Sequence, residues 1–184
     1  MKLTRDDWVE AAYQALLLGG PRAVAVANLA EALGVTRGSF YHYFDDRNEL
    51  LVAALEKWEA QATDTFIQRA SAKSEPVARL RRLFTQVFQK PTELAVAERR
   101  ILANQGEDDA VSEVVNRVVR RRRAFLADCY QALGYDETEA EDRAMVAYLT
   151  FTGWLYLTEP GDRQTNAATR RIAALLQDLL LPTD

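Results

Sequence analysis

The stretch LGVTRGSFYHYF, residues 33–44, decides the fold of this chain, because it joins a glycine turn to five consecutive ring side chains. Gly34 can adopt the left-handed backbone conformation of a tight turn. Thr36 is a candidate N-cap for a short helix over 37–43. With a two-turn helix over 26–33 before it, the stretch has the spacing of a helix-turn-helix, whose second helix enters the DNA major groove.

The second short helix is expected to divide its side chains between a core and a DNA surface. Phe40 points back toward the preceding helices, whereas Arg37, Gly38 and Ser39 lie at the N-terminal end, where base edges are met. Arg37 could donate two hydrogen bonds to guanine, and Gly38 has no side chain to hold the groove away. The residues predicted to contact the DNA backbone are Thr36, Tyr41, His42, Tyr43, Arg47 and Asn28. The alternative is a helical hairpin that packs in an all-α core and does not bind DNA.

The rest of the chain also has helical periodicity, and glycines and prolines fall between the periodic segments. The 184 residues predict an all-α fold of about nine helices, over 5–18, 26–33, 37–43, 47–70, 76–89, 93–104, 109–133, 139–158 and 165–181. The fourth is expected to be uninterrupted, because Leu51, Leu55, Trp58, Ala62 and Phe66 follow steps of three or four. N-caps are predicted at Thr4, at Asp46 and at Thr138, the last two with a glutamate three residues later.

The residues LAEALGVTRGSFYHYFDDRNELL, 29–51, resemble the tetracycline-repressor-like (TetR) family of bacterial regulators. The resemblance covers about 50 residues, and the remainder fits the family as a helical body of suitable length. It implies a helix-turn-helix DNA-binding domain over 1–46 and an effector-binding and dimerisation domain over 47–184. By the family pattern, residues 37, 38 and 39 meet bases, while Tyr41, Tyr43 and Arg47 meet the backbone.

The chain departs from this pattern where cations and hydroxyls are wanted. Ala25, Val26 and Ala27 stand where family members often carry threonine and a polar residue, and Arg47 stands where lysine is usual. The net charge is −4, and residues 1–50 hold five Lys/Arg against seven Asp/Glu. A DNA role therefore depends on locally placed cations, with a short phosphate footprint and a shallow dependence on salt.

Two later helices carry apolar stripes that suit a helical interface between two copies of the chain. The stripe residues, predicted as the dimer interface, are Ala140, Ala144, Ala147 and Phe151 in one helix and Ala168, Ile172, Leu175 and Leu179 in the other. Alternatively, both stripes face their own core. Dimerisation rests mostly on the family resemblance, and a two-fold DNA target also favours it.

The body of the chain offers candidates for an effector pocket, although an aromatic stripe at helical spacing is more often plain core. The candidates are Trp58, Phe66, Phe84, Phe88, Arg122, Tyr130, Tyr148, Thr152 and Trp154. Arg122 falls inside the apolar arc of its helix, so it needs a partner. In one interpretation, Arg122 pairs with a carboxylate such as Glu98 or Asp128, or its side chain extends to solvent. In the other, it binds an anionic effector. The neighbouring arginines point in different directions around the helix, so most of them are expected to be exposed to solvent. They are Arg117, Arg120, Arg121 and Arg123.

Nothing in the sequence predicts an enzyme or a cofactor. The only histidine is His42, the only cysteine is Cys129, and zinc, phosphate-loop and G-x-S-x-G patterns are missing. A carboxylate-only hydrolase or a di-metal helical site remains an open alternative, but paired E-x-x-H motifs are lacking. No apolar run suits a membrane helix or a secretion signal, so the cytoplasm is the expected compartment.

The leading hypothesis is a ligand-responsive, dimeric transcription regulator, a repressor that binds a palindromic operator in double-stranded DNA. A small-molecule effector would favour a dimer geometry with the wrong spacing, and DNA would be released. The rival hypothesis is a helical adaptor that keeps the helix-turn-helix head for assembly without operator-specific regulation. Two features support the adaptor hypothesis: the acidic charge of residues 1–50, and the absence of threonine from positions 25–27.

Overall fold

A computed structural model describes residues 3–72, 75–88, 93–157 and 163–181 of the chain. In these residues it contains nine α-helices and no strand, as the sequence predicts. The chain forms two compact units. One takes in the described residues up to Ala62 together with Ala97–Arg117, and the other takes in Thr63–Val96 and the described residues from Val118 onward. The first unit therefore holds more than the predicted head, since it includes a long helix after the helix-turn-helix.

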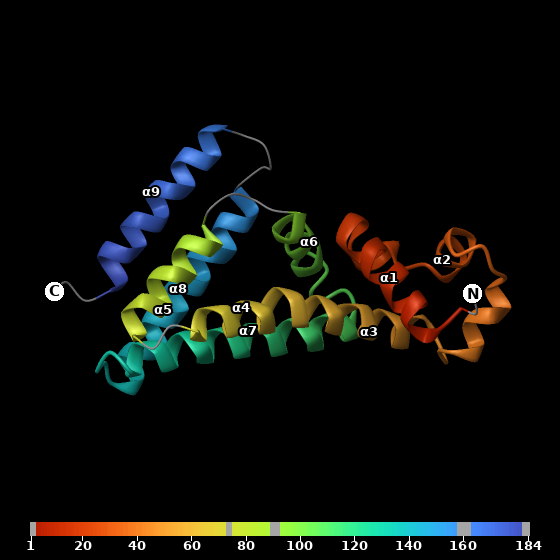
Figure 1. Ribbon diagram of the computed structural model, residues 1–184, viewed down its shortest axis with the longest axis horizontal. Helices are drawn as coiled ribbons and strands as arrows, with labels where there is room; N and C mark the ends of the chain where they lie inside the picture. Colours follow the sequence, from red (N-terminus) through yellow and green to blue (C-terminus); the bar gives the residue numbers. More distant parts are fainter. Residues whose placement is uncertain (1–2, 73–74, 89–92, 158–162, 182–184) are drawn as a thin grey trace. The chain divides into compact units, whose positions relative to one another are not determined.

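The first unit is built on two helices, α1 and α3, that lie side by side (Figure 1). Helix α1, Arg5–Gly19, packs against α3, Arg47–Glu59, and both bury large side chains. Trp8 and Leu16 from α1, and Trp58 from α3, are each completely buried. The 3-10 turn η1, Pro21–Ala23, then leads into α2, Val26–Ala32, and the 3-10 segment η2, Arg37–His42.

Two of the three N-caps predicted in this unit, Thr4 and Asp46, are present. The Thr4 hydroxyl accepts a hydrogen bond from the Asp7 amide, and the Asp7 carboxylate accepts one from the Thr4 amide, which completes a capping box. The Asp46 carboxylate accepts from the Glu49 amide at 2.9 Å. Glu49, however, reaches back to the amide of Asp45 at 2.8 Å, one residue before the expected partner.

The predicted long fourth helix is interrupted. Helix α3 passes through a π turn, η3 (Ala60–Asp64), into α4 (Thr65–Ser71). The buried positions shift accordingly: Trp58 is followed by Thr63, which is 1% exposed, and not by Ala62, which is only half-buried. A π turn contains one residue more than an α turn, so the buried positions after it are shifted by one residue along the sequence.

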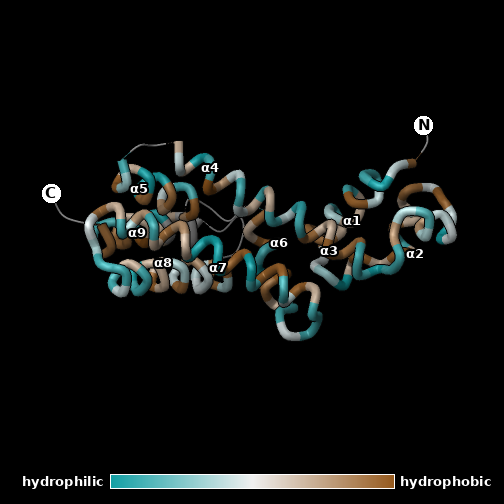
Figure 2. Tube along the Cα trace, turned by 90° about the horizontal axis from the view of Figure 1, so that it is seen from below, coloured by the Kyte–Doolittle hydropathy of each residue, from teal (hydrophilic) through white to brown (hydrophobic). Residues whose placement is uncertain are grey.

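The second unit packs α5, α8 and α9 side by side, as the two views in Figures 1 and 2 agree. Their bounds are Pro76–Val87, Glu137–Leu157 and Arg163–Leu180. Helix α7, Asp109–Gln131, begins in the first unit and ends in the second, and α6 covers Glu93–Leu102. The predicted cap at Thr138 is wrong. Helix α8 begins two residues earlier than predicted, at Glu137, and the carboxylate of Asp136 accepts from the Glu139 amide at 2.9 Å.

Candidate nucleic-acid interface

The turn between α2 and η2 has the backbone that its glycine predicts. Gly34 has a φ of +68°, the left-handed region that L side chains rarely adopt. Its amide donates to the Glu31 carbonyl at 3.0 Å, and the Val35 amide donates to the Ala30 carbonyl at 2.9 Å. Both bonds close the end of α2, so the chain leaves the helix in one fixed direction.

The recognition segment is a 3-10 helix, where the sequence predicted an ordinary short helix. The amides of Ser39 and Tyr43 donate to carbonyls three residues earlier, those of Thr36 and Phe40, at 3.1 and 2.9 Å. The predicted cap is also wrong in detail, because the Thr36 side chain makes no capping bond. Instead the Ser39 hydroxyl donates to the Thr36 carbonyl at 2.8 Å. The Ser39 proton is therefore used inside the segment.

The five rings divide between core and surface. Phe40 is completely buried, with its ring 5.4 Å from that of Trp8, and Phe44 stacks on it at 5.5 Å. Tyr41 is 64% exposed, and His42 is exposed beside it. Because the two phenylalanines anchor the segment, the residues between and before them stand on a fixed support.

Tyr43 is half-buried and its hydroxyl donates to the Leu3 carbonyl at 2.6 Å. A tyrosine hydroxyl has one proton to give, so this bond competes directly with donation to a phosphate. The residue joins the recognition segment to the chain just before α1. The geometry therefore favours a supporting role over the phosphate contact that the sequence predicted.

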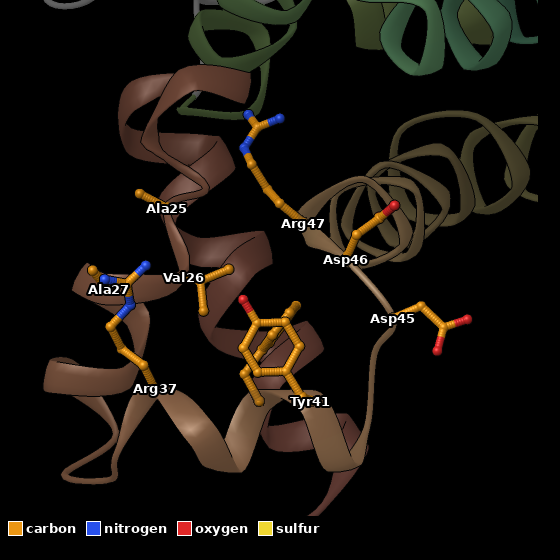
Figure 3. A pocket seen from close by; sticks show the side chains of 9 residues that line it. Ala25, Val26, Ala27, Arg37, Tyr41, Asp45, Asp46 and Arg47 are labelled. Carbon is orange, nitrogen blue, oxygen red and sulfur yellow. The ribbon is translucent and has the colours of Figure 1, made fainter.

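Arg47 is also turned away from the recognition segment. Its Nε donates to the Val24 carbonyl at 2.8 Å and one terminal nitrogen donates to the Pro21 carbonyl at 2.7 Å. Its other terminal nitrogen lies 3.7 Å from the carboxylate of Asp108. In Figure 3 its guanidinium points away from Tyr41, toward the connection between α1 and α2. The predicted phosphate ligand is thus engaged by protein groups.

A groove of about 520 Å³ opens between the start of α2, the recognition segment and the start of α3 (Figure 3). Its lining residues are Ala25, Val26, Ala27, Arg37, Phe40, Tyr41, Asp45, Asp46 and Arg47. Helix α2 begins at this groove and has no side-chain cap. Arg37 and Asn28 are both exposed, where the DNA prediction needs them.

Arg37 differs from the other arginines at this end of the chain. Arg5 pairs with Glu49 at 3.1 Å, Arg22 with Glu107 at 2.6 Å, and Arg47 approaches Asp108. Within the described residues, Arg37 has no carboxylate partner, and it is exposed at the start of η2. Of the four arginines at positions 5, 22, 37 and 47, Arg37 is therefore the one whose charge is left for an external anion.

Most of the predicted effector residues belong to the second unit, and Trp58 belongs to the first. Four aromatic rings of α8 and the end of α5 form a continuous cluster. The Trp154 ring lies 5.7 Å from Phe88 and 6.1 Å from Phe151, and Phe151 lies 6.2 Å from Tyr148. Three of the other candidates are packed or half-buried: Phe84 is 1% exposed, Phe66 is half-buried, and Thr152 donates to the Tyr148 carbonyl at 3.0 Å.

Arg122 meets both an aromatic ring and a hydroxyl. Its Nε donates to the Thr63 hydroxyl at 3.0 Å, and its guanidinium carbon lies 5.7 Å from the centre of the Phe151 ring. Sequence reasoning missed Thr63, because the π turn brings it to the buried face. It also read Arg117 as part of a solvated run, yet Arg117 donates to the buried carboxylate of Glu59 at 2.7 Å. That bond raises the pKa of Arg117.

Tyr130 carries a buried hydroxyl with no hydrogen-bond partner among the described residues. Burial raises the pKa of this phenol, so it stays protonated. Burial also raises the pKa of the Cys129 thiol to about 11, which leaves little of the thiolate that a nucleophile requires at neutral pH. Neither side chain has the setting of a catalytic group.

The alanines of the predicted dimer stripe of α8 are buried within the single chain, as in the alternative that the stripe faces its own core. Ala140, Ala144 and Ala147 are at most 3% exposed in the single chain, so they cannot contact a second copy. The exposed apolar side chains of α8 are Val146, Leu149, Tyr156 and Leu157, with exposed fractions from 48% to 85%. In α9 the predicted stripe is largely available. Ile172, Leu175 and Leu179 are 36%, 55% and 65% exposed, while Ala168 is half-buried, as is Phe151 in α8.

Two wider features of the described residues complete the picture. No group of three or more histidine, cysteine or acidic side chains in them is arranged to hold a metal ion. Among the helices that the structure describes, none combines the length and apolar character needed to cross a bilayer.

The geometry defines a class of protein: a helix-turn-helix head carried by a helical body. A sequence model described as "Bacterial regulatory proteins, tetR family" matches residues 9–54. The transcriptional repressor LfrR of Mycolicibacterium smegmatis is 31% identical over 133 residues, which cover 66% of this chain and 68% of the relative. The chain therefore belongs to the TetR family of bacterial regulatory proteins.

Two further comparisons bear on the body. The transcriptional regulator TtgR of Pseudomonas putida is 29% identical over 133 residues, or 71% of this chain, and the match spans 62% of the relative's own length. A crystal structure of a transcriptional regulator from Saccharomonospora viridis, in complex with choline, has a TM-score of 0.78 at 16% identity and covers 95% of this chain and 94% of its own. At this identity the second likeness shows the fold alone.

Proposed function

We propose that this chain is a DNA-binding transcription regulator that acts as a homodimer on a palindromic operator and represses until a small-molecule effector releases it. The observation that carries the proposal is the surface of the recognition segment. Buried Phe40 and Phe44 hold that segment, while Arg37 stands exposed and unpaired by any carboxylate in the described residues. A fixed support with an available guanidinium is what reading base edges requires.

The proposed contacts divide into base readers and backbone contacts. Arg37 and Gly38 meet base edges, and Ser39 lends an acceptor, since its proton is already donated. Tyr41, His42, Thr36 and Asn28 are exposed and are the proposed phosphate contacts. Because three arginines of the unit are paired with carboxylates, few cations remain for phosphates. We therefore expect the affinity to fall gently with salt.

A second copy of this chain is the proposed occupant of the exposed apolar side chains on α8 and α9. Val146, Leu149 and Tyr156 are spaced by three and seven residues, so they share one face of α8. Ile172, Leu175 and Leu179 likewise share one face of α9. Two such helices from each copy would form a four-helix interface, and the dimer would present two recognition segments to two half-sites.

An effector is proposed to bind in the helical body among the aromatic residues of the second unit. The choline complex of the structural neighbour supports a small-molecule site in this fold, without identifying the ligand here. An effector that binds one dimer geometry better than the DNA-bound one shifts the population and lowers DNA affinity. Arg122 remains a candidate contact for such a ligand, through a guanidinium that already stacks on Phe151.

Selection of bound fragments from fragmented genomic DNA by the purified protein tests the proposal. At low salt the protein should enrich a palindromic sequence with half-sites about one helical turn apart. The same selection with Gly38→Glu is the matched control, because it places a side chain and a negative charge at the groove face of an exposed glycine. Failure of the unaltered protein to enrich any palindrome would favour the adaptor hypothesis.

A further inference from the structure

The guanidinium of Arg47 joins the two ends of the helix-turn-helix. Arg47 is the first residue of α3 and is separated from the recognition segment by residues 43–46, whereas Val24 and Pro21 precede α2. The bonds at 2.8 and 2.7 Å therefore span 23 and 26 residues of sequence. The side chain of Arg47 therefore closes a loop of the backbone that contains α2, the turn and η2.

The acceptors of these bonds are not open to solvent. Val24 is completely buried, Pro21 is buried, and the two hydrogen bonds are part-buried. If Arg47 turned outward to a phosphate, both carbonyls would lose a charged donor in a place where water is restricted. The Pro21 carbonyl also accepts from the Val24 amide at 3.2 Å, so the larger loss falls on the Val24 carbonyl. Losing a charged hydrogen bond to a buried acceptor costs more than an exposed ion pair returns.

The third arm of the guanidinium reaches the segment between α6 and α7. Asp108 lies 3.7 Å away with one carboxylate oxygen, and its other oxygen accepts from the amides of Ala110 and Val111 at 3.0 and 3.3 Å. The same carboxylate therefore caps α7 and faces Arg47. Within the first unit, Arg47 thus connects the starts of α3 and α7 to the turn before α2.

We propose that Arg47 is a positioning residue of the DNA-binding head and not a phosphate ligand. It fixes the recognition segment relative to α1 and α3 before DNA arrives. The inference rests on the proposed function, and it reverses the role that the family pattern assigns to this position. Lysine, usual there, is a point charge and cannot reproduce a planar fork that serves two carbonyls and a carboxylate.

Two substitutions separate the roles, because Arg47→Lys keeps the charge and Arg47→Met removes it while keeping the stem. A phosphate ligand tolerates lysine. A positioning residue does not. We expect both variants to bind the operator about tenfold more weakly than the unaltered protein. We also expect the slope of log affinity against log salt to stay the same in both, since no phosphate contact is lost.

A measurement without DNA provides the second readout. Amide hydrogen exchange at Val24 and Ala25 should accelerate in both variants, because the bonds that hold this connection are gone. Arg37→Met is the matched control. It should weaken DNA binding and leave these amides protected, as Arg37 makes no comparable contact among the described residues.

The outcomes decide between the roles. Full operator affinity in Arg47→Lys, together with a slope that falls by about 0.9 in Arg47→Met, would overturn the inference and restore a phosphate contact. Unchanged affinity in both variants would also overturn it. If the unaltered protein selects no operator, the proposed function fails, and hydrogen exchange alone then decides: unchanged protection refutes the positioning role, and faster exchange supports it.

Discussion

At the scale of single residues, the first unit neutralises most of its own arginines and leaves Arg37 available. An arginine already paired with a carboxylate must exchange that partner for phosphate, which gains little. An exposed arginine without such a partner offers its whole fork to a base edge. The acidic composition of this end of the chain is thus compatible with the proposed DNA reading, in which the guanidinium of Arg37 would carry most of the specificity.

Replacement of Arg37 by alanine should lower the discrimination between the operator and a one-base variant. We expect a loss of about 1–3 kcal/mol if its contact with guanine is bidentate. Tyr41→Phe should instead weaken all sequences evenly, by about 0.5–1.5 kcal/mol, since a hydroxyl on a phosphate carries no direct sequence information. Competition binding with matched and mismatched duplexes measures both effects. An Arg37→Ala protein that keeps its operator preference would show the base-reading assignment to be wrong.

Spacing predicted that Phe40 is buried, but not where the side chains of Tyr43 and Arg47 would turn. Phe40 and Phe44 are core, as their place relative to the supporting helices requires. Tyr43 and Arg47 instead bond to the carbonyls of Leu3, Val24 and Pro21. Backbone carbonyls leave no mark in the sequence, so a partner of this kind can be found only once the chain has been folded.

At the scale of elements, two glycines of the helix-turn-helix differ in their physical purpose. Gly34 needs its left-handed backbone, and a Cβ there would meet nothing within 4 Å. Gly34→Ala should therefore cost about 1–2 kcal/mol through backbone strain alone. That cost corresponds to a fall in Tm of roughly 2–8 °C at about 2–4 °C per kcal/mol for a chain of this length.

Gly38→Ala is the matched control for that substitution. Its Cβ would lie 3.8 Å from the Thr36 hydroxyl, an ordinary contact, and its backbone is not left-handed. We expect an unchanged Tm and weaker DNA binding, because the added methyl group stands where the recognition segment meets the groove. Thermal unfolding and operator titration of the two alanine variants should thus give opposite patterns.

Helix boundaries were predictable because glycine, proline and capping residues mark them, whereas the faces of the helices were less so. Helix α8 is apolar around much of its circumference, so its alanine stripe and its Val146–Leu149 face are equally plausible in sequence. Small residues suit a close approach in either a core or an interface. Which face of α8 is buried depends on α9 and α5, which pack beside it.

At the scale of the whole molecule, operator reading should depend on a second copy of the chain. Leu175→Glu combined with Leu179→Glu places two charges on the exposed face of α9. If this face is the interface, burying them should weaken dimerisation by at least about 100-fold, the equivalent of roughly 2.7 kcal/mol. Sedimentation at a series of protein concentrations measures the shift.

Leu18→Glu supplies the control, since Leu18 is a leucine of α1 that is 76% exposed and lies in the other unit. It should leave the dimer intact. A double variant of α9 that remains dimeric at the same concentration as the unaltered protein would place the interface elsewhere, and the exposed face of α8 alone would be the next candidate.

The π turn between α3 and α4 gives the helix a tolerance to changes in length. It is equivalent to a one-residue insertion that the helix absorbs within one turn. Deletion of the exposed Ala60 would restore an ordinary four-residue step from Trp58 to Thr63, so both would stay buried. The shortened protein should therefore fold with a Tm within about 4 °C of the original.

Deletion of Ala53, inside regular α3, should instead rotate the buried leucines by about 100° and unfold the first unit. If both deletions unfold the protein equally, the π turn has no such tolerance. If only the Ala53 deletion unfolds the protein, a one-residue deletion at the π turn leaves the fold intact. Related regulators that differ by one residue at this point would then share the same architecture.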